Sequence, residues 1–345
     1  MWSAGAFFNR VWYERSVWSR LLSPLAGLFA WLVGARQGLY RSAILKSRRA
    51  PVPVVVVGNI TVGGTGKTPV TLWLAERLKE RGFKPGIASR GYGGRTGSAP
   101  LHVNDASDAA SVGDEPLLLA RRVVCPVVVH PDRAAAAGLL AAMGCDVVLL
   151  DDGLQHYRLE RDFEIAVVDG ARGFGNGRML PAGPLREPAS RLDSVNRILL
   201  KQPGDAAHEV LAPLAARVTP FRLTVRDVQS LHGGRRMAID EFAGRCVHAV
   251  AGIADPESFF NLLRAHGIEV LPHPFPDHAR IAHSDLAFGD DRPVLMTEKD
   301  AVRSERAAPA HSWRVAVDVA IGPDADLAWL EELASRLRAP AEQGA

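Results

Sequence analysis

Cysteine is scarce in this chain. Its 345 residues include 3 cysteines, Cys125, Cys145 and Cys246, which lie far apart in the sequence. This number and spacing provide neither a disulfide framework nor a zinc-binding pattern, which excludes a small disulfide-rich fold and a zinc module. We expect these cysteines to be buried thiols in a reducing compartment.

The N-terminal segment has little acidic charge and no apolar run of membrane-spanning length. Its uncharged stretch, Leu21 to Ala35, has fifteen residues, whereas a spanning helix needs about 20. A secretory signal is disfavoured because the apolar region would begin late. The first 50 residues carry one acid, Glu14, against eight arginines and lysines. We favour a helix lying at a membrane surface with basic and aromatic anchors over an ordinary core helix.

The overall composition is that of a folded protein. Hydrophobic residues make up 47 % of the chain and charged residues 23 %, the formal net charge is +3, and the length is sufficient for two domains. We find no internal repeat and no low-complexity segment.

The most informative segment joins an apolar run, Val54 to Val57, to a glycine-rich turn and an amphipathic stretch. Such a turn can direct backbone N–H groups at one anion, while Lys67 adds positive charge near the β- and γ-phosphates and the Thr68 hydroxyl can bind Mg²⁺. The strict phosphate-loop pattern has glycine where this chain has Thr61. A turn that only joins a strand to its helix is the alternative. We predict a nucleotide-binding loop formed by Thr61, Val62, Gly63, Gly64, Thr65, Gly66, Lys67 and Thr68.

Apolar strand-like runs then alternate with helical ones, which is typical of a parallel sheet with helices on both faces. The predicted fold class is α/β: a P-loop NTPase-type parallel sheet with helices on both faces, plus a smaller second α/β lobe joined by an extended-strand linker. The predicted segments are a membrane-associated helix at 1–40, a nucleotide-binding core at 41–200, linker strands at 201–235, a second lobe at 236–322, and a C-terminal helix and tail at 323–345 that packs back on the core.

Two acidic pairs could take part in chemistry. Asp151 and Asp152 follow the run Val147 to Leu150, at a position where carboxylates hold or orient Mg²⁺ in nucleotide-binding proteins; two acids capping a turn are the alternative. Asp114 and Glu115 precede a helical run. They could be partners of a helix dipole, or one of them could take a proton from a substrate hydroxyl.

Three other clusters contain arginine, glutamate or histidine in loops: Ser89 to Arg95, Pro181 to Pro188, and Phe275 to His278. Their arginines could clamp phosphates, and the imidazole titrates near neutral pH. Taken singly, each cluster is more often structural than catalytic.

The order of these motifs resembles the tetraacyldisaccharide 4'-kinase family of lipid A biosynthesis. The resemblance runs over nearly the whole chain and rests on eight motifs, from Gly58 to Arg303: GNxxxGGTGKTP, RGYG, GDEP, HPDR, DDGLQH, GPLREP, FPDH and TEKDAVR. The family shares the missing glycine at position 61. This chain departs from many members at Leu154 and Ala279, where local packing is affected but the polar groups are retained.

The resemblance implies an activity and a set of roles. Members transfer phosphate from ATP, with Mg²⁺, to the 4'-hydroxyl of a tetraacyl glucosamine disaccharide 1-phosphate at the cytoplasmic face of the Gram-negative inner membrane. It implies Asp114 as general base assisted by His278, with Lys67 on the phosphates. Metal positions fall on Thr68, Asp151, Asp152 and Glu115. Supporting positions fall on Tyr92, Arg133, Gln155, His156, Arg186 and Glu187.

Other functions explain less of the sequence. A membrane-associated nucleotide switch would use the phosphate loop but leave Asp114 and His278 without a task. A GTPase is disfavoured because Lys299 and Asp300 are adjacent, whereas guanine recognition needs [NT]-K-x-D. Basic residues that flank an apolar run suit lipid better than nucleic acid, so we expect no nucleic-acid partner. We expect a monomer. The role of Thr297 to Arg303 stays open, either near the nucleotide or at a hinge between lobes.

Overall fold

The valine run after Pro53 forms the central strand β1 (Val54–Gly58), which is buried along its whole length. The structure is a computed structural model that describes residues 4–14, 16–94, 97–202, 204–277, 279, 281–305, 307–323, 325 and 327–339. Side chains along β1 alternate between two cores: Val55 and Val57 pack with one cluster, and Val54 and Val56 with another. This period of two, with both faces apolar, marks a strand covered by helices on each side.

One sheet runs through the whole molecule. Its strand order is β11-β10-β12-β13-β8-β7-β6-β1-β5-β2-β4-β3, with β9 paired to β8. The remaining strands are β2 (Pro85–Ser89), β3 (Leu101–Val103), β4 (Val127–Val129), β5 (Val147–Asp151), β6 (Phe163–Asp169), β7 (Arg197–Lys201), β8 (Val218–Ser230), β9 (Arg236–Met237), β10 (Cys246–Ala251), β11 (Glu269–Pro274), β12 (Val294–Thr297) and β13 (Ser312–Ile321).

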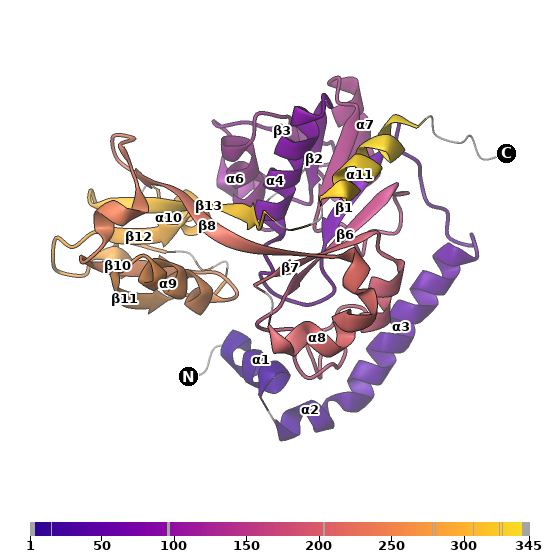
Figure 1. Cartoon of the computed structure of the whole chain (residues 1–345), viewed down its shortest axis with the longest axis horizontal. Coiled ribbons are helices and arrows are strands. Elements are labelled where there is room, and N and C mark those ends of the chain that lie inside the picture. The colour runs from indigo at the N-terminus through magenta and orange to yellow at the C-terminus, as the bar shows by residue number, and fades with distance from the viewer. Residues whose placement is uncertain are drawn as a thin grey trace.

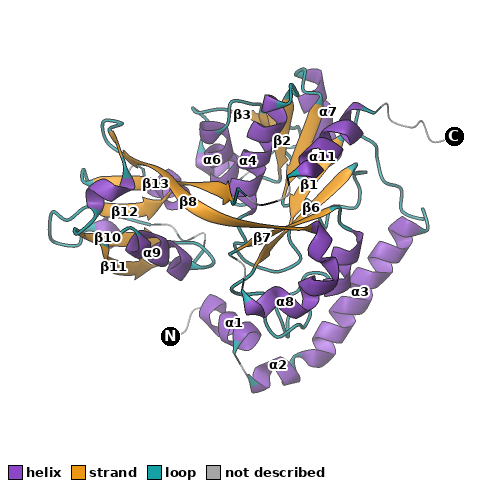
Figure 2. Ribbon diagram, viewed as in Figure 1, coloured by secondary structure: helices purple, strands orange, loops and turns teal. Residues whose placement is uncertain are grey.

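Helices cover both faces of this sheet (Figure 2). The α-helices are α1 (Ala4–Tyr13), α2 (Val17–Leu21), α3 (Ser23–Arg41), α4 (Lys67–Glu80), α5 (Ala109–Val112), α6 (Asp114–Arg122), α7 (Arg133–Ala142), α8 (Asp205–Leu211), α9 (Pro256–Ala265), α10 (Glu298–Ser304) and α11 (Ala328–Arg338). The 3₁₀ helices are η1 (Ala189–Ser194), η2 (Ala212–Arg217), η3 (Ile239–Phe242) and η4 (His283–Leu286). A mostly parallel sheet with helices on both faces confirms the predicted fold class.

Two long strands join the lobes. β8 pairs in parallel with β7 through Val218–Phe221 and then antiparallel with β13 as far as Ser230. In Figure 1 this two-stranded ribbon crosses from the core lobe, which contains β1, to the second lobe, which contains β10 to β12. The sequence prediction identified extended strands near β8 but no strand at β13, which is the main partner of β8.

The N-terminal segment is three helices, α1, α2 and α3, instead of the single predicted helix. α3 begins at Ser23, with a proline in its first turn. Among the described residues, no helix is both long and apolar enough to cross a membrane.

The last helix, α11, lies on the core lobe. Its buried side chains Trp329, Leu330 and Leu333 belong to the same apolar cluster as Val55 and Leu74. The ring of Trp329 lies 6.1 Å from that of Trp73 on α4, measured between centroids. The chain therefore leaves the core through β8, builds the second lobe, and returns through β13.

Candidate active site

The glycine-rich turn lies between the carboxyl end of β1 and the start of α4. Gly63 has φ +118° and Gly66 has φ +93°, conformations that favour glycine because other residues would place Cβ against the backbone. Gly66 directly precedes the first helical residue, Lys67. The buried Thr65 hydroxyl has no hydrogen-bond partner among the described residues. A turn of this form at a helix N-terminus is suited to binding phosphate.

The acidic pair at the end of β5 lies beside this turn, and its two carboxylates have different surroundings. Asp151 is buried and accepts a hydrogen bond of 3.1 Å from the Thr71 hydroxyl on α4. Burial, followed by the charges of Glu115 and Asp152, raises the pKa of Asp151 to about 7.

Asp152 is instead paired with two cations. Its carboxylate lies 3.7 Å from Lys67 Nζ and 3.2 Å from Arg186 Nη1. Burial raises the pKa of Asp152, but Lys67 and Arg186 outweigh burial and hold that pKa below its usual value. Its backbone is in the left-handed region at φ +54°. A non-glycine residue there is strained, a feature that occurs at functional sites.

Asp114 and Glu115 begin helix α6 and face the second lobe. Gly113, just before them, has φ +90°, and a Cβ at this position would lie 2.6 Å from the Tyr92 carbonyl oxygen. Arg303 Nε donates to Asp114 Oδ2, and Lys299 Nζ donates to Glu115 Oε1 at 2.9 Å. Both cations belong to α10. The segment Thr297 to Arg303, whose role the sequence left open, therefore contacts Asp114, the predicted base.

His278 lies outside the described residues, so its predicted role as a partner of Asp114 stays a prediction. Its sequence neighbour Asp277 accepts a hydrogen bond of 3.0 Å from Lys299 Nζ. Asp277 Oδ1 is also 3.9 Å from Arg303 Nη2.

Arg133, which is buried, and His156, which is half-buried, lie near β5. Arg133 donates to the backbone oxygens of His130 at 3.1 Å and Asp151 at 3.5 Å. Burial lowers the pKa of Arg133 to about 10. Burial, then the charges of Arg133 and Arg161, lowers the pKa of His156 to about 4, so this imidazole is neutral at pH 7. Its buried Nε2 has no partner among the described residues.

Tyr92 contrasts with these groups. Tyr92 is 64 % exposed, and its carbonyl oxygen lies against the turn before α6. The structure therefore places the Tyr92 main chain beside the predicted base, and the role of its side chain stays a prediction.

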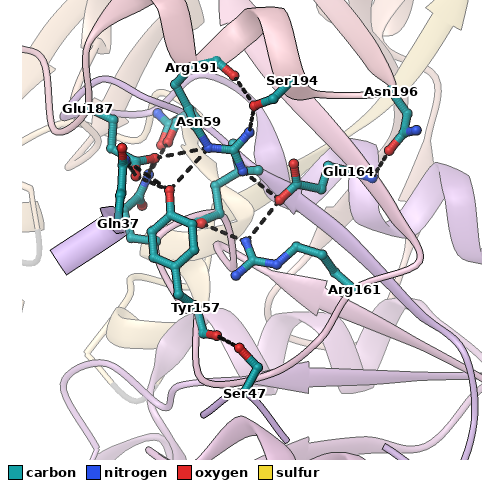
Figure 3. A network of polar contacts seen from close by, with 12 residues as sticks. Gln37, Ser47, Asn59, Tyr157, Arg161, Glu164, Glu187, Arg191, Ser194 and Asn196 are labelled. Atoms are coloured by element: carbon teal, nitrogen blue, oxygen red, sulfur yellow. Dashed lines mark hydrogen bonds and ion pairs between the residues drawn. The ribbon is translucent and has the colours of Figure 1, made fainter. Parts of the chain in front are cut away.

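Glu187 anchors the loop that carries Arg186. Figure 3 shows its carboxylate among side chains from several elements. It accepts hydrogen bonds from Gln37 Nε2 on α3 at 2.7 Å, from Gln155 Nε2 at 3.0 Å and from the Tyr157 hydroxyl. Glu187 is 1 % exposed, so its carboxylate faces these protein groups and not solvent.

The same loop contacts the phosphate turn through its backbone. Val62 N donates to Pro184 O at 2.8 Å, and Arg186 N donates to Ile60 O at 2.7 Å. The two loops are therefore held in register, which fixes Arg186 beside Asp152.

Sequence reasoning missed three further groups at this site. Asp169 and Lys201 end the neighbouring strands β6 and β7 and form a buried ion pair of 2.6 Å. Their position at strand ends, equivalent to that of Asp151, was the available signal.

Arg172 stacks on Tyr13 of α1 and donates to the Ala254 carbonyl at 3.4 Å. No local pattern identifies Arg172, because its contacts come from distant segments.

Known proteins that are similar to this chain belong to one enzyme family. The model of the LpxK family, tetraacyldisaccharide-1-P 4'-kinase, matches residues 18–337. A tetraacyldisaccharide 4'-kinase from Alkalilimnicola ehrlichii is 50 % identical over 91 % of this chain and 94 % of its own length. One from Pseudomonas paraeruginosa is 47 % identical over 93 % of this chain and 94 % of its own length.

A solved structure is also similar. The crystal structure described as an "apo" form of LpxK from Aquifex aeolicus in complex with ATP superimposes with a TM-score of 0.75 and 28 % identity. It covers 93 % of this chain and 99 % of that one. These matches confirm the predicted family, fold and enzyme class: the chain belongs to the tetraacyldisaccharide-1-phosphate 4'-kinase family of ATP-dependent kinases in lipid A biosynthesis.

Proposed function

We propose that this protein transfers the γ-phosphoryl group of ATP to the 4'-hydroxyl of a tetraacyl glucosamine disaccharide 1-phosphate, with Asp114 as general base. The main structural support is the arrangement around α4. A phosphate-binding turn, the Lys67 ammonium and the acids after β5 lie at the carboxyl edge of the sheet, where ligands bind in α/β folds. Asp114 enters from the neighbouring helix α6.

Phosphoryl transfer requires mainly positioning and charge neutralisation. The backbone N–H groups of Gly63 to Thr68 would hold the phosphates, and Lys67 would balance charge on the group being transferred. Asp114 would accept the hydroxyl proton as the new O–P bond forms and the bond to ADP breaks. His278 would orient this carboxylate, as the family resemblance implies. Because Asp152 lies between Lys67 and Arg186, it would keep both cations at the phosphate site.

The residues present also fit Mg²⁺. This ion commonly takes one or two carboxylates and fills its other positions with phosphate and water oxygens. Thr68 supplies a hydroxyl in the first turn of α4. Asp151, Asp152 and Glu115 supply carboxylates nearby; burial and then the charges of Glu115 and Asp152 raise the pKa of Asp151. A divalent cation bound by Thr68 and these acids would neutralise charge on the phosphates.

The N-terminal helices carry an exposed apolar surface. Several large apolar side chains there are more than half exposed: Val17, Trp18, Leu21, Leu25, Leu28, Trp31 and Leu32. We propose that this surface lies in the cytoplasmic face of the inner membrane, with Arg20 and Arg36 near anionic headgroups. A substrate with four acyl chains remains in the bilayer, so the enzyme must reach it there.

The test is transfer of labelled γ-phosphate from ATP to the lipid disaccharide 1-phosphate in detergent, with and without Mg²⁺. We expect Mg²⁺-dependent product from the wild type. Asp114→Ala should lose transfer by roughly 10²- to 10⁴-fold, the usual contribution of a general base, and retain its ATP affinity. Lys67→Ala should weaken ATP binding as well.

Two results would contradict this proposal. ATP hydrolysis without lipid product would favour a nucleotide switch. Equal loss of ATP binding in Asp114→Ala and Lys67→Ala would contradict the assignment of Asp114 to proton transfer and of Lys67 to nucleotide binding.

A further inference from the structure

Helices α6 and α10 face each other across the two lobes and are joined by ion pairs along their length. Arg122, at the end of α6, pairs with Glu298 at the start of α10, and both side chains are 7 % exposed. Lys299 and Arg303 pair with Glu115 and Asp114 at the opposite end of α6. The contact therefore places two cations of the second lobe on the two acids that begin α6.

Arg303 is held rigidly. Its side chain is 6 % exposed, and Nη1 donates to Gly252 O at 3.1 Å and to Asp300 Oδ1 at 3.3 Å. Asp300 is itself fully buried and accepts from the Gly252 backbone N–H at 2.8 Å and from the Thr297 hydroxyl. A Cβ on Gly252 would lie 2.7 Å from Asp300 Oδ1, so only glycine allows this close approach.

The Arg303 guanidinium donates a hydrogen bond to only one of the two carboxylate oxygens of Asp114. Nε donates to Oδ2 alone, and Oδ1 accepts no hydrogen bond from any residue that the structure describes. The Asp114 side chain is 22 % exposed. One carboxylate oxygen is thus fixed by a buried guanidinium, and the other is left for a hydroxyl group to approach.

We propose that Arg303 is a positioning residue for phosphoryl transfer, which fixes Asp114 Oδ2 so that Oδ1 faces the acceptor hydroxyl. Lys299 assists by joining Glu115 to Asp277, the residue that precedes His278. In this proposal, the segment Thr297 to Arg303 connects the second lobe to the general base through the ion pairs of Lys299 and Arg303. This inference rests on the proposed role of Asp114.

The experiment compares Arg303→Met, Arg303→Lys and a matched control, Arg121→Met. Arg121 on α6 also pairs with the second lobe, at 3.0 Å from Glu305, the residue that follows α10. That pair is exposed and involves neither acid at the start of α6. We measure kcat, KM for the lipid, ATP affinity and thermal unfolding for each variant.

We expect Arg303→Met to lower kcat by about 100-fold, as misplacement of a catalytic group does. Its ATP affinity and lipid KM should stay within about twofold of the wild type. Arg303→Lys should recover about tenfold of the lost rate, because it keeps the charge without the planar guanidinium. Arg121→Met should leave kcat within about twofold, as expected of an exposed pair.

A double variant separates positioning from general stability. If Arg303 acts through Asp114, Asp114→Asn with Arg303→Met should be no slower than Asp114→Asn alone. Losses that multiply, or an Arg303→Met rate no lower than that of Arg121→Met, would overturn the inference. Wild-type activity in Asp114→Asn would instead overturn the proposed base, so the two failures can be told apart.

Discussion

Asp151 and Asp152 show how neighbouring identical residues acquire opposite properties. Asp151 is surrounded by apolar strand residues, a threonine hydroxyl and other acids, so burial and like charge raise its pKa to about 7. Asp152 turns toward Lys67 and Arg186, which lower its pKa. The difference comes from the groups that surround each carboxylate, since Asp151 faces other acids and Asp152 faces two cations.

Asp151→Asn should therefore stabilise the protein at alkaline pH. Because its folded pKa exceeds the unfolded value of about 4, the native state retains a proton that the unfolded chain has lost. The stability from this site is complete below about pH 4 and is lost as pH rises through about 7. We expect Asp151→Asn to raise the free energy of unfolding by roughly 2 to 4 kcal/mol at pH 8, but not near pH 4.

Denaturant unfolding as a function of pH checks this prediction. The matched variant Asp152→Asn should show the opposite sign at neutral pH, because the lowered pKa of Asp152 adds stability above its unfolded value. A gain for Asp151→Asn that does not depend on pH would contradict the explanation.

At the scale of elements, α3 has two different ends. Its first turns carry exposed apolar side chains such as Leu28 and Trp31, whereas Gln37 near its end donates to the buried Glu187. The end of the helix is thus attached to the loop that contains Arg186. Its earlier turns are apolar and are not covered by any other part of the described chain. This arrangement suits an element that contacts lipid at one end and supports the site at the other.

Trp31→Glu should weaken binding to vesicles that contain anionic lipid by about tenfold or more, because it removes a large apolar contact and adds a charge. Trp31 is 67 % exposed, so the fold should be retained. Vesicle co-sedimentation is the measurement. Val124→Glu is the control, since Val124 is 85 % exposed but lies outside the N-terminal helices. Equal losses in both variants would argue against a specific membrane surface.

At the scale of the whole molecule, one continuous sheet unites two lobes with separate cores. The ribbon of β8 and β13 carries the sheet from one lobe to the other, and α6 and α10 are linked beside it by ion pairs. The chain then returns to the core lobe as α11, so residues at the end of the sequence stabilise the strand that begins the nucleotide site.

Trp329→Ala should destabilise the core lobe by about 3 to 5 kcal/mol, the usual cost of removing a large buried aromatic side chain. Trp329 is 3 % exposed and packs near Trp73 and Phe163. Denaturant unfolding checks the prediction. Glu332→Ala on the exposed face of α11 should change stability by less than about 1 kcal/mol, because it removes only a surface ion pair. Similar effects of the two changes would show that α11 does not stabilise the core.

Much of the nucleotide-binding lobe was predictable because its signals are local. The valines of β1 and the glycines of the turn lie in one short segment, and β5 with its two acids lies in another. The alternation of strands and helices indicates a parallel sheet. The ordered motifs also carried the family assignment. The predicted segment boundaries and site roles remain predictions.

The sequence alone determined the nucleotide-binding turn and most of the alternating strands and helices, because backbone propensity, glycine conformation and apolar periodicity act over a few residues. It did not predict β13 or the division of the N-terminal segment into three helices. Only the tertiary structure decided which distant groups meet. Arg303 and Asp114 are 189 residues apart, Gln37 and Glu187 are 150 apart, and β13 pairs with β8 across the second lobe. Such contacts depend on how the sheet is ordered and how the lobes pack, and a local pattern does not contain that information.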